Sequence, residues 1–291
     1  MPSDSLQRFH FRDSPVRGEL CQLTQSYREV LARHDYPLPV QVLLGQAMAA
    51  VALMASMLKL EGSLILQIQG DGPLSLLVAE SNERGELRAI ARYDHEAVIA
   101  GDEWTALTGQ GQLVLTIDPD EGQRYQGIVP LEGGSLAAAL GHYFQQSEQL
   151  PTEFFLFADS QAAGGLMLQV LPGHDDGDDP DLWPRSVNLA GTLRAEEVLA
   201  LSIEEVLYRL YHEESIELFS AHPLAFKCTC SRARSENALR SIDMDELRAI
   251  VREQGGFIEV DCQFCHQRYR FDSVDVEQLA HDALTGTDSL Q

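Results

Sequence analysis

The pattern of apolar and polar positions divides the chain into a strand-rich region and several helical ones. Between residues 62 and 130, apolar residues alternate with polar ones in short runs that are separated by turn residues. A period of two places every second side chain on one face, which is typical of half-buried β-strands. We therefore expect antiparallel strands at SLILQIQ, LSLLVAE, ELRAIARYD, GQLVLTIDP and RYQGIVPLEG.

After these strands the spacing becomes helical and then returns to strands. Ser135 precedes an apolar-rich stretch that ends near Gln149, and serine is a favoured N-cap. TEFFLFADS (152–160) and GGLMLQVLP (164–172) have the composition of two further strands. Helices and strands thus occupy separate blocks, which predicts an α+β domain of mainly antiparallel sheet with packed helices over residues 1–172.

One predicted helix is apolar enough to raise the question of a membrane span. The stretch VQVLLGQAMAAVALMASML (40–58) has no charge and is nearly long enough to cross a bilayer. It is rich in alanine, however, and contains Gln41, Gly45, Gln46 and Ser56. We therefore predict a helix buried inside a soluble domain, with no membrane partner.

Residues 173–226 are predicted to form a linker between two domains. It begins with GHDDGDDPD (173–181), in which five Asp, two Gly and one Pro leave little to bury, so we expect an exposed boundary there. Residues 194–214 then have the spacing of one amphipathic helix. Its apolar stripe must be covered, and ordinary packing against the first domain is the expected resting arrangement. The stripe consists of Leu199, Ile203, Val206, Leu207, Leu210 and Tyr211.

Charge narrows the range of partners. The 291 residues include 45 acidic and 21 basic side chains, a formal net charge of −24. Binding to nucleic acids or anionic membranes depends on neutralising phosphates, so we expect neither. The start of the chain, MPSDSLQRFHFRD, lacks the basic end and apolar stretch of a secretory signal, and we expect a cytoplasmic protein.

The cysteines carry the most specific chemical signal. Cys21 stands alone, whereas Cys228, Cys230, Cys262 and Cys265 form two close pairs near the C-terminus. Two such pairs can supply four thiolates to one tetrahedral ion, and zinc suits this donor set best, although ligand type alone does not exclude an iron–sulfur centre. Residues 227–291 are too few to form a stable hydrophobic core easily without a metal ion or another cross-link. The size of this region and the cysteine spacing together predict a small zinc-binding domain. The pair Cys262 and Cys265 should lie on the turn of a hairpin.

Two features of the site bear on whether the metal is permanent. A disulfide across Cys-x-Cys closes a small ring, which ties oxidation to rearrangement of the backbone. Several cations lie close in sequence to the cysteines and are expected to stabilise thiolates, the form that oxidants attack. Spacing and charge alone favour an inert structural zinc over a redox switch. The cations are Lys227, Arg232, Arg234, Arg268 and Arg270.

Other readings of the same residues remain open. His222 and His266 could replace a cysteine ligand, but with four cysteines present we expect them to be bystanders. Cys262-x-x-Cys265 has the spacing of a thiol-disulfide oxidoreductase, yet it lacks a helix start beside a βαβ unit. A constitutive zinc-ribbon adaptor is a third hypothesis. No phosphate-binding loop is present, because Gly70-Asp71-Gly72-Pro73 between two strands is better explained as a tight turn.

The chain nevertheless resembles a known family almost from end to end, the redox-regulated bacterial heat-shock chaperones called 33 kDa chaperonin. This resemblance favours the hypothesis of a redox switch over that of an inert structural zinc. It rests on VRGEL (16–20), HDYP (34–37), QGDGPL (69–74), RYQGIVPLEG (124–133), SEQLPT (147–152), GGLMLQVLP (164–172), LYRLYHEE (207–214), FKCTCSR (226–232) and CQFC (262–265).

The resemblance implies a holdase without enzymatic activity. In such chaperones the reduced form holds one Zn²⁺ and is inactive. Peroxide or hypochlorous acid, together with heat, oxidises the cysteines, releases the metal and unfolds the linker, and the active form dimerises and captures unfolding proteins without ATP. Carried over by motif, the ligands are Cys228, Cys230, Cys262 and Cys265, with disulfides Cys228–Cys230 and Cys262–Cys265 after oxidation. Cys21 matches no cysteine of that pattern and receives no role.

A client-binding surface can be suggested from the same pattern. If the zinc domain helps to cover the stripe of the 194–214 helix, loss of the metal uncovers apolar side chains that are each worth about 1.5–3 kcal/mol when buried. We therefore expect clients to bind at this stripe, whose residues are those given above.

Overall fold

The computed structural model describes residues 4–58, 61–97, 104–131, 134–172 and 179–285. Two compact units divide the chain, one ending at Lys227 and the other beginning at Cys228. The expected boundary at Pro172 is therefore not a division between compact units, because the described residues from 179 to 227 pack within the first one. Most of the acidic stretch, residues 173–178, lies outside the described residues, while residues 179–181 are exposed.

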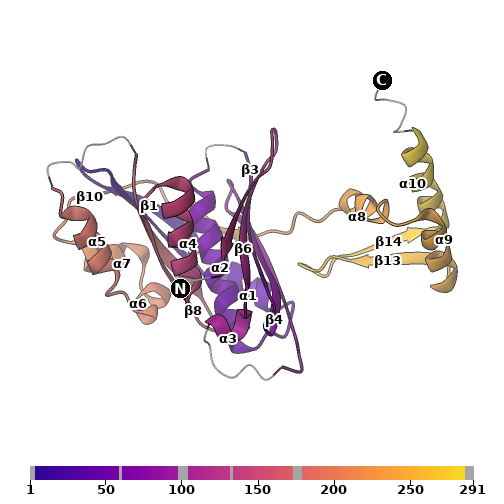
Figure 1. Cartoon of the computed structure of the whole chain (residues 1–291), viewed down its shortest axis with the longest axis horizontal. Coiled ribbons are helices and arrows are strands. Elements are labelled where there is room, and N and C mark those ends of the chain that lie inside the picture. The colour runs from indigo at the N-terminus through magenta and orange to yellow at the C-terminus, as the bar shows by residue number, and fades with distance from the viewer. Residues whose placement is uncertain (1–3, 59–60, 98–103, 132–133, 173–178, 286–291) are drawn as a thin grey trace. The chain divides into compact units, whose positions relative to one another are not determined.

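The first unit contains two antiparallel sheets of six strands each (Figure 1). The first sheet has the order β10-β1-β2-β9-β8, and β11 also pairs with β1. Its strands are β1 (Ser5–Phe11), β2 (Val16–Leu23), β8 (Thr152–Ala158), β9 (Ala163–Val170), β10 (Ile216–Leu218) and β11 (His222–Pro223).

The second sheet has the order β12-β5-β4-β3-β6-β7, and only β12 runs parallel to its neighbour among the described strands. The five strands expected between residues 62 and 130 are all present in it. The strands are β3 (Gly62–Gly70), β4 (Leu74–Asn82), β5 (Glu86–Tyr93), β6 (Gly111–Pro119), β7 (Tyr125–Pro130) and β12 (Ala225–Phe226).

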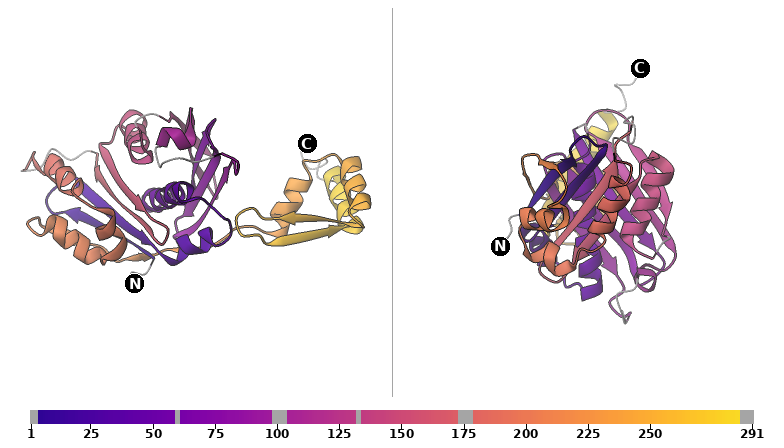
Figure 2. Two further views of the ribbon diagram at one scale, coloured as in Figure 1. Left: turned by 90° about the horizontal axis from the view of Figure 1, so that it is seen from below. Right: turned by 90° about the vertical axis from the view of Figure 1, so that its left-hand side faces the viewer.

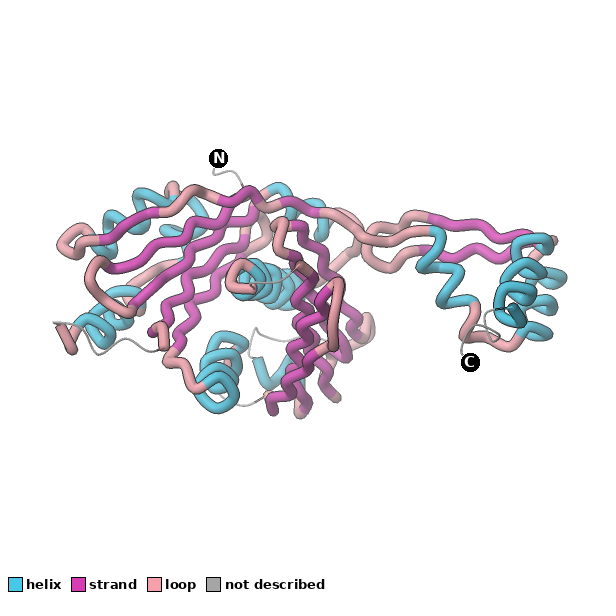
Figure 3. Tube along the Cα trace, turned by 90° about the horizontal axis from the view of Figure 1, so that it is seen from above, coloured by secondary structure: helices cyan, strands magenta, loops and turns pink. Residues whose placement is uncertain are grey.

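The apolar helix α2 (Leu38–Ala55) lies between the two sheets (Figure 3). It contacts β2, β8 and β9 on one side and β3, β4 and β5 on the other. Thirteen of its residues are buried, which is why it can be apolar all round in the core of a folded domain. The helix is long and apolar enough to cross a membrane by composition alone, but 72% of it is buried inside the structure, as we expected for a core helix.

Shorter helices close the ends of this core. They are α1 (Gln25–Leu31), α3 (Trp104–Thr108) and α4 (Leu136–Tyr143), which continues into a π-helical turn, η1 (Phe144–Glu148). Ser135 caps α4 as predicted, because its hydroxyl accepts a hydrogen bond from Ala138 N at 3.1 Å.

Three helices cover the face of the first sheet that points away from α2 (Figure 2, left). They are α5 (Leu182–Ala190), α6 (Ala195–Ala200) and α7 (Ile203–Tyr211). The single helix expected over 194–214 is wrong in this respect, since Leu201 is extended and Ser202 starts a new helix. Ser202 Oγ accepts from Glu205 N at 3.2 Å while the Glu205 carboxylate accepts from Ser202 N at 3.0 Å, and this reciprocal cap ends α6 and begins α7.

The second unit is a two-stranded hairpin with three helices and a small core of its own. Among the residues up to 279, whose burial is described, its core contains seven buried apolar residues, among them Leu247 and Phe271 at 0% exposure. The α+β class with a small C-terminal domain is confirmed. The elements are α8 (Arg232–Leu239), α9 (Met244–Glu253), β13 (Phe257–Asp261), β14 (Arg268–Asp272) and α10 (Ser273–Thr285).

Candidate metal centre

The hairpin β13–β14 positions the second cysteine pair. Five residue pairs join the two strands from Phe257–Asp272 to Asp261–Arg268, and Cys262 and Cys265 lie on the turn between them, as predicted. Cys262 N donates to Gln267 O at 2.9 Å and His266 N donates to Cys262 O at 2.8 Å. His266 takes a left-handed backbone conformation, φ 59°, which allows this tight turn. Both sulfurs thereby leave the turn from a fixed backbone.

The first pair lies on the short connection between β12 (Ala225–Phe226) and α8. Ser231 follows Cys230 directly and caps α8, because its hydroxyl accepts from Arg234 N at 3.2 Å. The cap begins the helix after the cysteines, so Cys228 and Cys230 lie in the non-helical chain that precedes α8.

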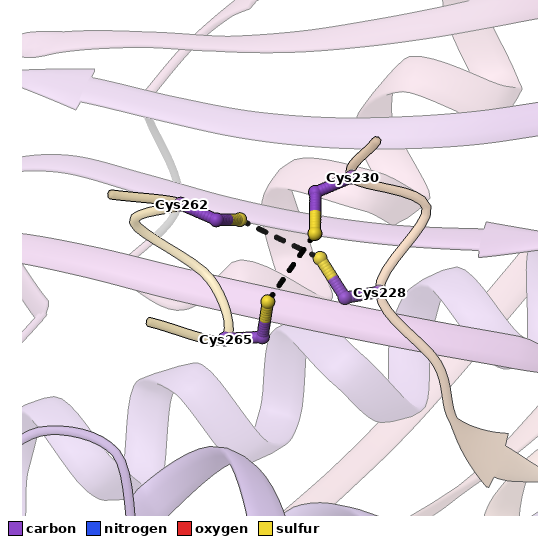
Figure 4. Close-up of side chains that lie close together, drawn as sticks. All are labelled: Cys228, Cys230, Cys262 and Cys265. Carbon is purple, nitrogen blue, oxygen red and sulfur yellow. Dashed lines mark hydrogen bonds between the residues drawn. The ribbon is translucent and has the colours of Figure 1, made fainter. Parts of the chain in front are cut away.

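The four sulfurs converge on one point (Figure 4). All lie within 4.8 Å of one another. Cys228 Sγ is 3.6 Å from Cys262 Sγ, and Cys230 Sγ is 3.4 Å from Cys265 Sγ. A tetrahedral ion with metal–sulfur bonds of about 2.3 Å requires sulfurs about 3.8 Å apart, so the cluster is close to the size that zinc needs. All four side chains are half-buried, and the donor set therefore fits a structural Zn²⁺ site.

The thiols themselves dominate the electrostatics of the site. Burial raises the pKa of Cys228 and raises that of Cys265 to about 12. The neighbouring sulfurs raise the pKa of Cys265 further, whereas on Cys228 some raise the pKa and Cys265 lowers it. Burial also acts to raise the pKa of Cys230, but hydrogen bonds from the Tyr269 hydroxyl, at 3.2 Å, and from the other cysteines lower it overall. The surroundings of Cys230 therefore favour its thiolate form, unlike those of Cys228 and Cys265.

The cations expected to stabilise the thiolates have other partners. Arg268 pairs with Asp261 at 2.7 Å and Glu259 at 2.9 Å, and Arg232 pairs with Asp275 at 2.8 Å. The Arg270 guanidinium lies over the Phe257 ring, and Arg234 donates to the Thr229 hydroxyl at 2.5 Å. Lys227 pairs with a carboxylate of the first unit, Glu86. Nearness in sequence was misleading here: acidic side chains pair with Arg232, Arg268 and Lys227, and an aromatic ring and a hydroxyl contact Arg270 and Arg234.

The other candidate ligands lie elsewhere or are not part of the cluster. His222 belongs to β11 of the first unit, and His266, which follows Cys265, is not among the four groups that converge. Cys21 is fully buried on β2, where its Sγ lies 3.6 Å from Ala49 O. Burial raises the pKa of the Cys21 thiol strongly, which keeps it protonated and unreactive.

The stripe proposed for clients is buried against the first sheet. Five of its six residues are 7% exposed or less, and they share one apolar cluster with Phe9, Phe11 and Leu20 of β1 and β2. The expected packing against the first domain is thus present. The five residues are Ile203, Val206, Leu207, Leu210 and Tyr211.

Leu199 is the one residue of the predicted stripe that does not pack in this cluster, and the sequence pattern did not identify its buried neighbour Val198. Val198 is 0% exposed, whereas Leu199 is only half-buried and outside that cluster. The break at Leu201 changes the rotation of α6 relative to α7, so the stripe does not continue to Leu199. Gln22 Nε2 fixes the end of α6 by donating to Val198 O at 2.6 Å and Leu201 O at 2.7 Å. A polar residue inside β2 was the sequence signal for this contact.

The arrangement disfavours a disulfide oxidoreductase. Cys262 and Cys265 lie on a hairpin turn, not at the start of a helix whose dipole would lower a thiol pKa. Each of these sulfurs also lies within 3.6 Å of a sulfur of the other pair. The geometry suits shared coordination of one ion.

Comparisons with known proteins agree across the whole chain. The family model described as "Hsp33 protein" matches residues 4–272. The 33 kDa chaperonin of Ectopseudomonas mendocina (strain ymp) is 50% identical over 280 residues, covering 95% of this chain and 95% of that protein. The 33 kDa chaperonin of Azotobacter vinelandii is 51% identical over 279 residues, covering 95% and 94%. The crystal structure of the 33 kDa chaperonin from Thermotoga maritima superposes with a TM-score of 0.82 at 26% identity, covering 97% of this chain and 99% of that one.

Proposed function

Because this chain belongs to the Hsp33 family of chaperones, we propose that it is a redox-regulated holdase that captures unfolding proteins under oxidative and heat stress without ATP. The observation that carries the proposal is the convergence of four thiols within 4.8 Å in a unit with a small apolar core. A site that holds a small domain together and consists of oxidisable groups can act as a sensor.

In the reduced state, Cys228, Cys230, Cys262 and Cys265 would hold one Zn²⁺. Bound zinc supplies folding free energy, about 10–16 kcal/mol in small zinc domains, and favours the thiolate form of its ligands. The second unit buries only seven apolar side chains in its described core, so it depends on that contribution. The reduced protein is the inactive form in this proposal.

Oxidation would remove the ligands in pairs. Two thiols lose two electrons and two protons to form one disulfide, and one hydrogen peroxide accepts them and becomes two water molecules. The expected bonds are Cys228–Cys230 and Cys262–Cys265. In the cluster each pair contributes sulfurs that approach those of the other pair, at 3.6 Å and 3.4 Å, so disulfides within the pairs would remove the coordination that joins the two segments. Loss of that coordination would open the second unit.

Opening of that unit would release the segment that precedes it. Lys227 is adjacent in sequence to Cys228, and residues 179–227 connect back to α5, α6 and α7. Release of these helices would uncover both the stripe on α7 and the sheet face beneath it, including Phe9 and Phe11. Burial of such a side chain contributes about 1.5–3 kcal/mol, which makes the uncovered surface adhesive to unfolded clients.

Partners and location follow from the same properties. The bare apolar surface would also favour a homodimer of the active form. A net charge of −24 disfavours nucleic acid and anionic membranes, and the apolar helix α2 is occupied in the core, so we propose a cytoplasmic protein that works on unfolded clients. The chemistry is binding, and we assign no catalytic residue.

Aggregation of a heat-denatured client is the direct test. The protein oxidised by peroxide should suppress light scattering without ATP, and the reduced protein should not. Replacing all four clustered cysteines by serine should give activity without oxidant, whereas the matched control Cys21→Ser should leave the redox response unchanged. A quadruple variant that protects clients no better than the reduced parent contradicts the proposal.

A further inference from the structure

One continuous segment, residues 215–227, closes an edge of each sheet in the first unit. Its first part, β10 and β11, pairs with β1, and its last part, β12, pairs with β5. We call it the edge segment. The opposite edges of the two sheets, β8 and β7, have no further strand beside them among the described residues. The edge segment therefore covers two edges, while two others are open.

Along β1 the pairing is a regular antiparallel ladder. Arg12 N donates to Ser215 O at 2.8 Å, and Phe219 N donates to Arg8 O at 3.0 Å. His10 and Glu217 are paired between these positions, so Glu217 occupies the hydrogen-bonded site of the ladder. Leu218 and Ile216 stand opposite Phe9 and Phe11. The occupant of this edge thus offers backbone groups together with an apolar side chain at every second position.

Along β5 the edge is shorter. Ala225 N donates to Gly85 O and Lys227 N donates to Leu87 O, both at 2.9 Å. The Phe226 side chain packs on the main core beside Leu87, under the Arg33 guanidinium at 4.0 Å from its ring centroid. This edge accepts a short extended stretch with one large apolar or aromatic side chain.

The edge segment buries few of its side chains, although Phe226 packs on the core, Arg8 lies over the Phe219 ring and Lys227 pairs with Glu86. Leu224, at 6% exposure, is the only buried residue in it, and residues 217–221 are all exposed. Leu218 and Phe219 keep 44% and 47% of their surface exposed. Its strands are two or three residues long, and short pairings with little buried area open most readily. It ends at Lys227, directly before the first metal-site cysteine.

We propose that the edge segment is a built-in strand mimic and that clients bind by adding an extended strand to the edges it vacates, β1 and β5. The inference rests on the proposed function, since release of the segment follows from opening of the second unit. The partner is an unfolded polypeptide stretch with apolar residues at alternate positions, because that pattern matches Ile216 and Leu218 opposite β1. Main-chain pairing is independent of side-chain identity, which gives a holdase its breadth.

Hydrogen exchange on the full chain tests this assignment. Amides that face the edge segment, those of His10 and Arg12 on one edge and of Leu87 on the other, should lose protection when the protein is oxidised and regain it when a denatured client is bound. The edges β7 and β8 serve as internal controls, because they are open before and after oxidation. An oxidised protein that captures no client contradicts the proposed function itself. Capture of client with continued fast exchange at β1 and β5, or with new protection at β7 and β8 instead, contradicts strand addition alone.

Competition by a peptide gives an independent readout. A synthetic peptide of residues 214–226, ESIELFSAHPLAF, should displace clients from the oxidised protein. The same peptide with Glu217→Pro lacks the ladder N–H opposite His10 and should compete about 5- to 150-fold more weakly. The control is Glu217→Ala, which changes the same side chain but keeps the ladder N–H opposite His10. Equal competition by the Glu217→Pro and Glu217→Ala peptides, or none by the parent peptide, overturns the proposal.

Discussion

Truncation of one buried leucine should activate the chaperone without oxidant. Leu207 on α7 is 1% exposed and packs in the cluster formed with Phe9, Phe11 and Leu20. Leu207→Ala removes this contact and leaves a cavity, at a cost of about 2–5 kcal/mol to docking of the helix. A change of about 1.4 kcal/mol shifts an equilibrium tenfold, so the undocked population should rise by about 30- to 4,000-fold.

The assay is suppression of client aggregation by the reduced protein with its metal retained. We expect partial activity for Leu207→Ala and none for the parent, with increased hydrogen exchange confined to α5, α6 and α7. The matched control is Tyr208→Ala on the same helix, because Tyr208 is 71% exposed and its loss should not affect docking. A Leu207→Ala protein that exchanges faster in these helices and still binds no client would refute the role of the buried stripe.

Three further predictions concern stability. Burial raises the pKa of Glu19 from 4.5 to about 7, although a hydrogen bond from the Ser56 hydroxyl acts to lower it. Between pH 4.5 and 7 the folded protein therefore keeps a proton on Glu19 that the unfolded protein has lost. The free energy of unfolding should fall as the pH rises through this range. Glu19→Gln should remove this pH dependence and stabilise the protein at pH 8 by about 3 kcal/mol at most, as measured by urea unfolding at several pH values. A pH profile that the substitution leaves unchanged would show that ionisation of Glu19 does not destabilise the folded state. Ser202→Ala should lower stability by about 1 kcal/mol through loss of the α7 cap, seen as a lower denaturation midpoint, and no change would mean that packing alone sets this helix start. A chelator under reducing conditions should unfold the second unit while α2 stays protected from hydrogen exchange, and a second unit that remains folded would contradict its dependence on the metal.

Much of this architecture follows from local patterns in the sequence. Alternation with turn residues locates β3 to β7, and Ser135 locates the start of α4, because these signals are strong within a few residues. The metal site follows from the spacing of four cysteines, since few other arrangements place four thiols together. These elements are specified by contacts close in sequence or by rare residue types.

Contacts that depend on the tertiary fold were not accessible from the sequence. The break between α6 and α7 requires Ser202 and Glu205 to act as a cap inside what is otherwise a continuous helical period. The pairing of β12 with β5 joins residues about 140 positions apart through the backbone, which leaves no side-chain signature. The partners of Arg232 and Arg268 are decided by which acidic side chains the fold brings near. Such choices are made by packing after the local elements have formed.

The central claim is that oxidation of one thiol cluster controls a concealed client-binding surface. The most direct measurement is a peroxide titration at elevated temperature that follows zinc release, hydrogen exchange of α7 and suppression of client aggregation in the same samples. We predict that the three signals change together and reverse together on reduction. Stoichiometric zinc release without exchange in α7 and without any gain in client protection would contradict the account.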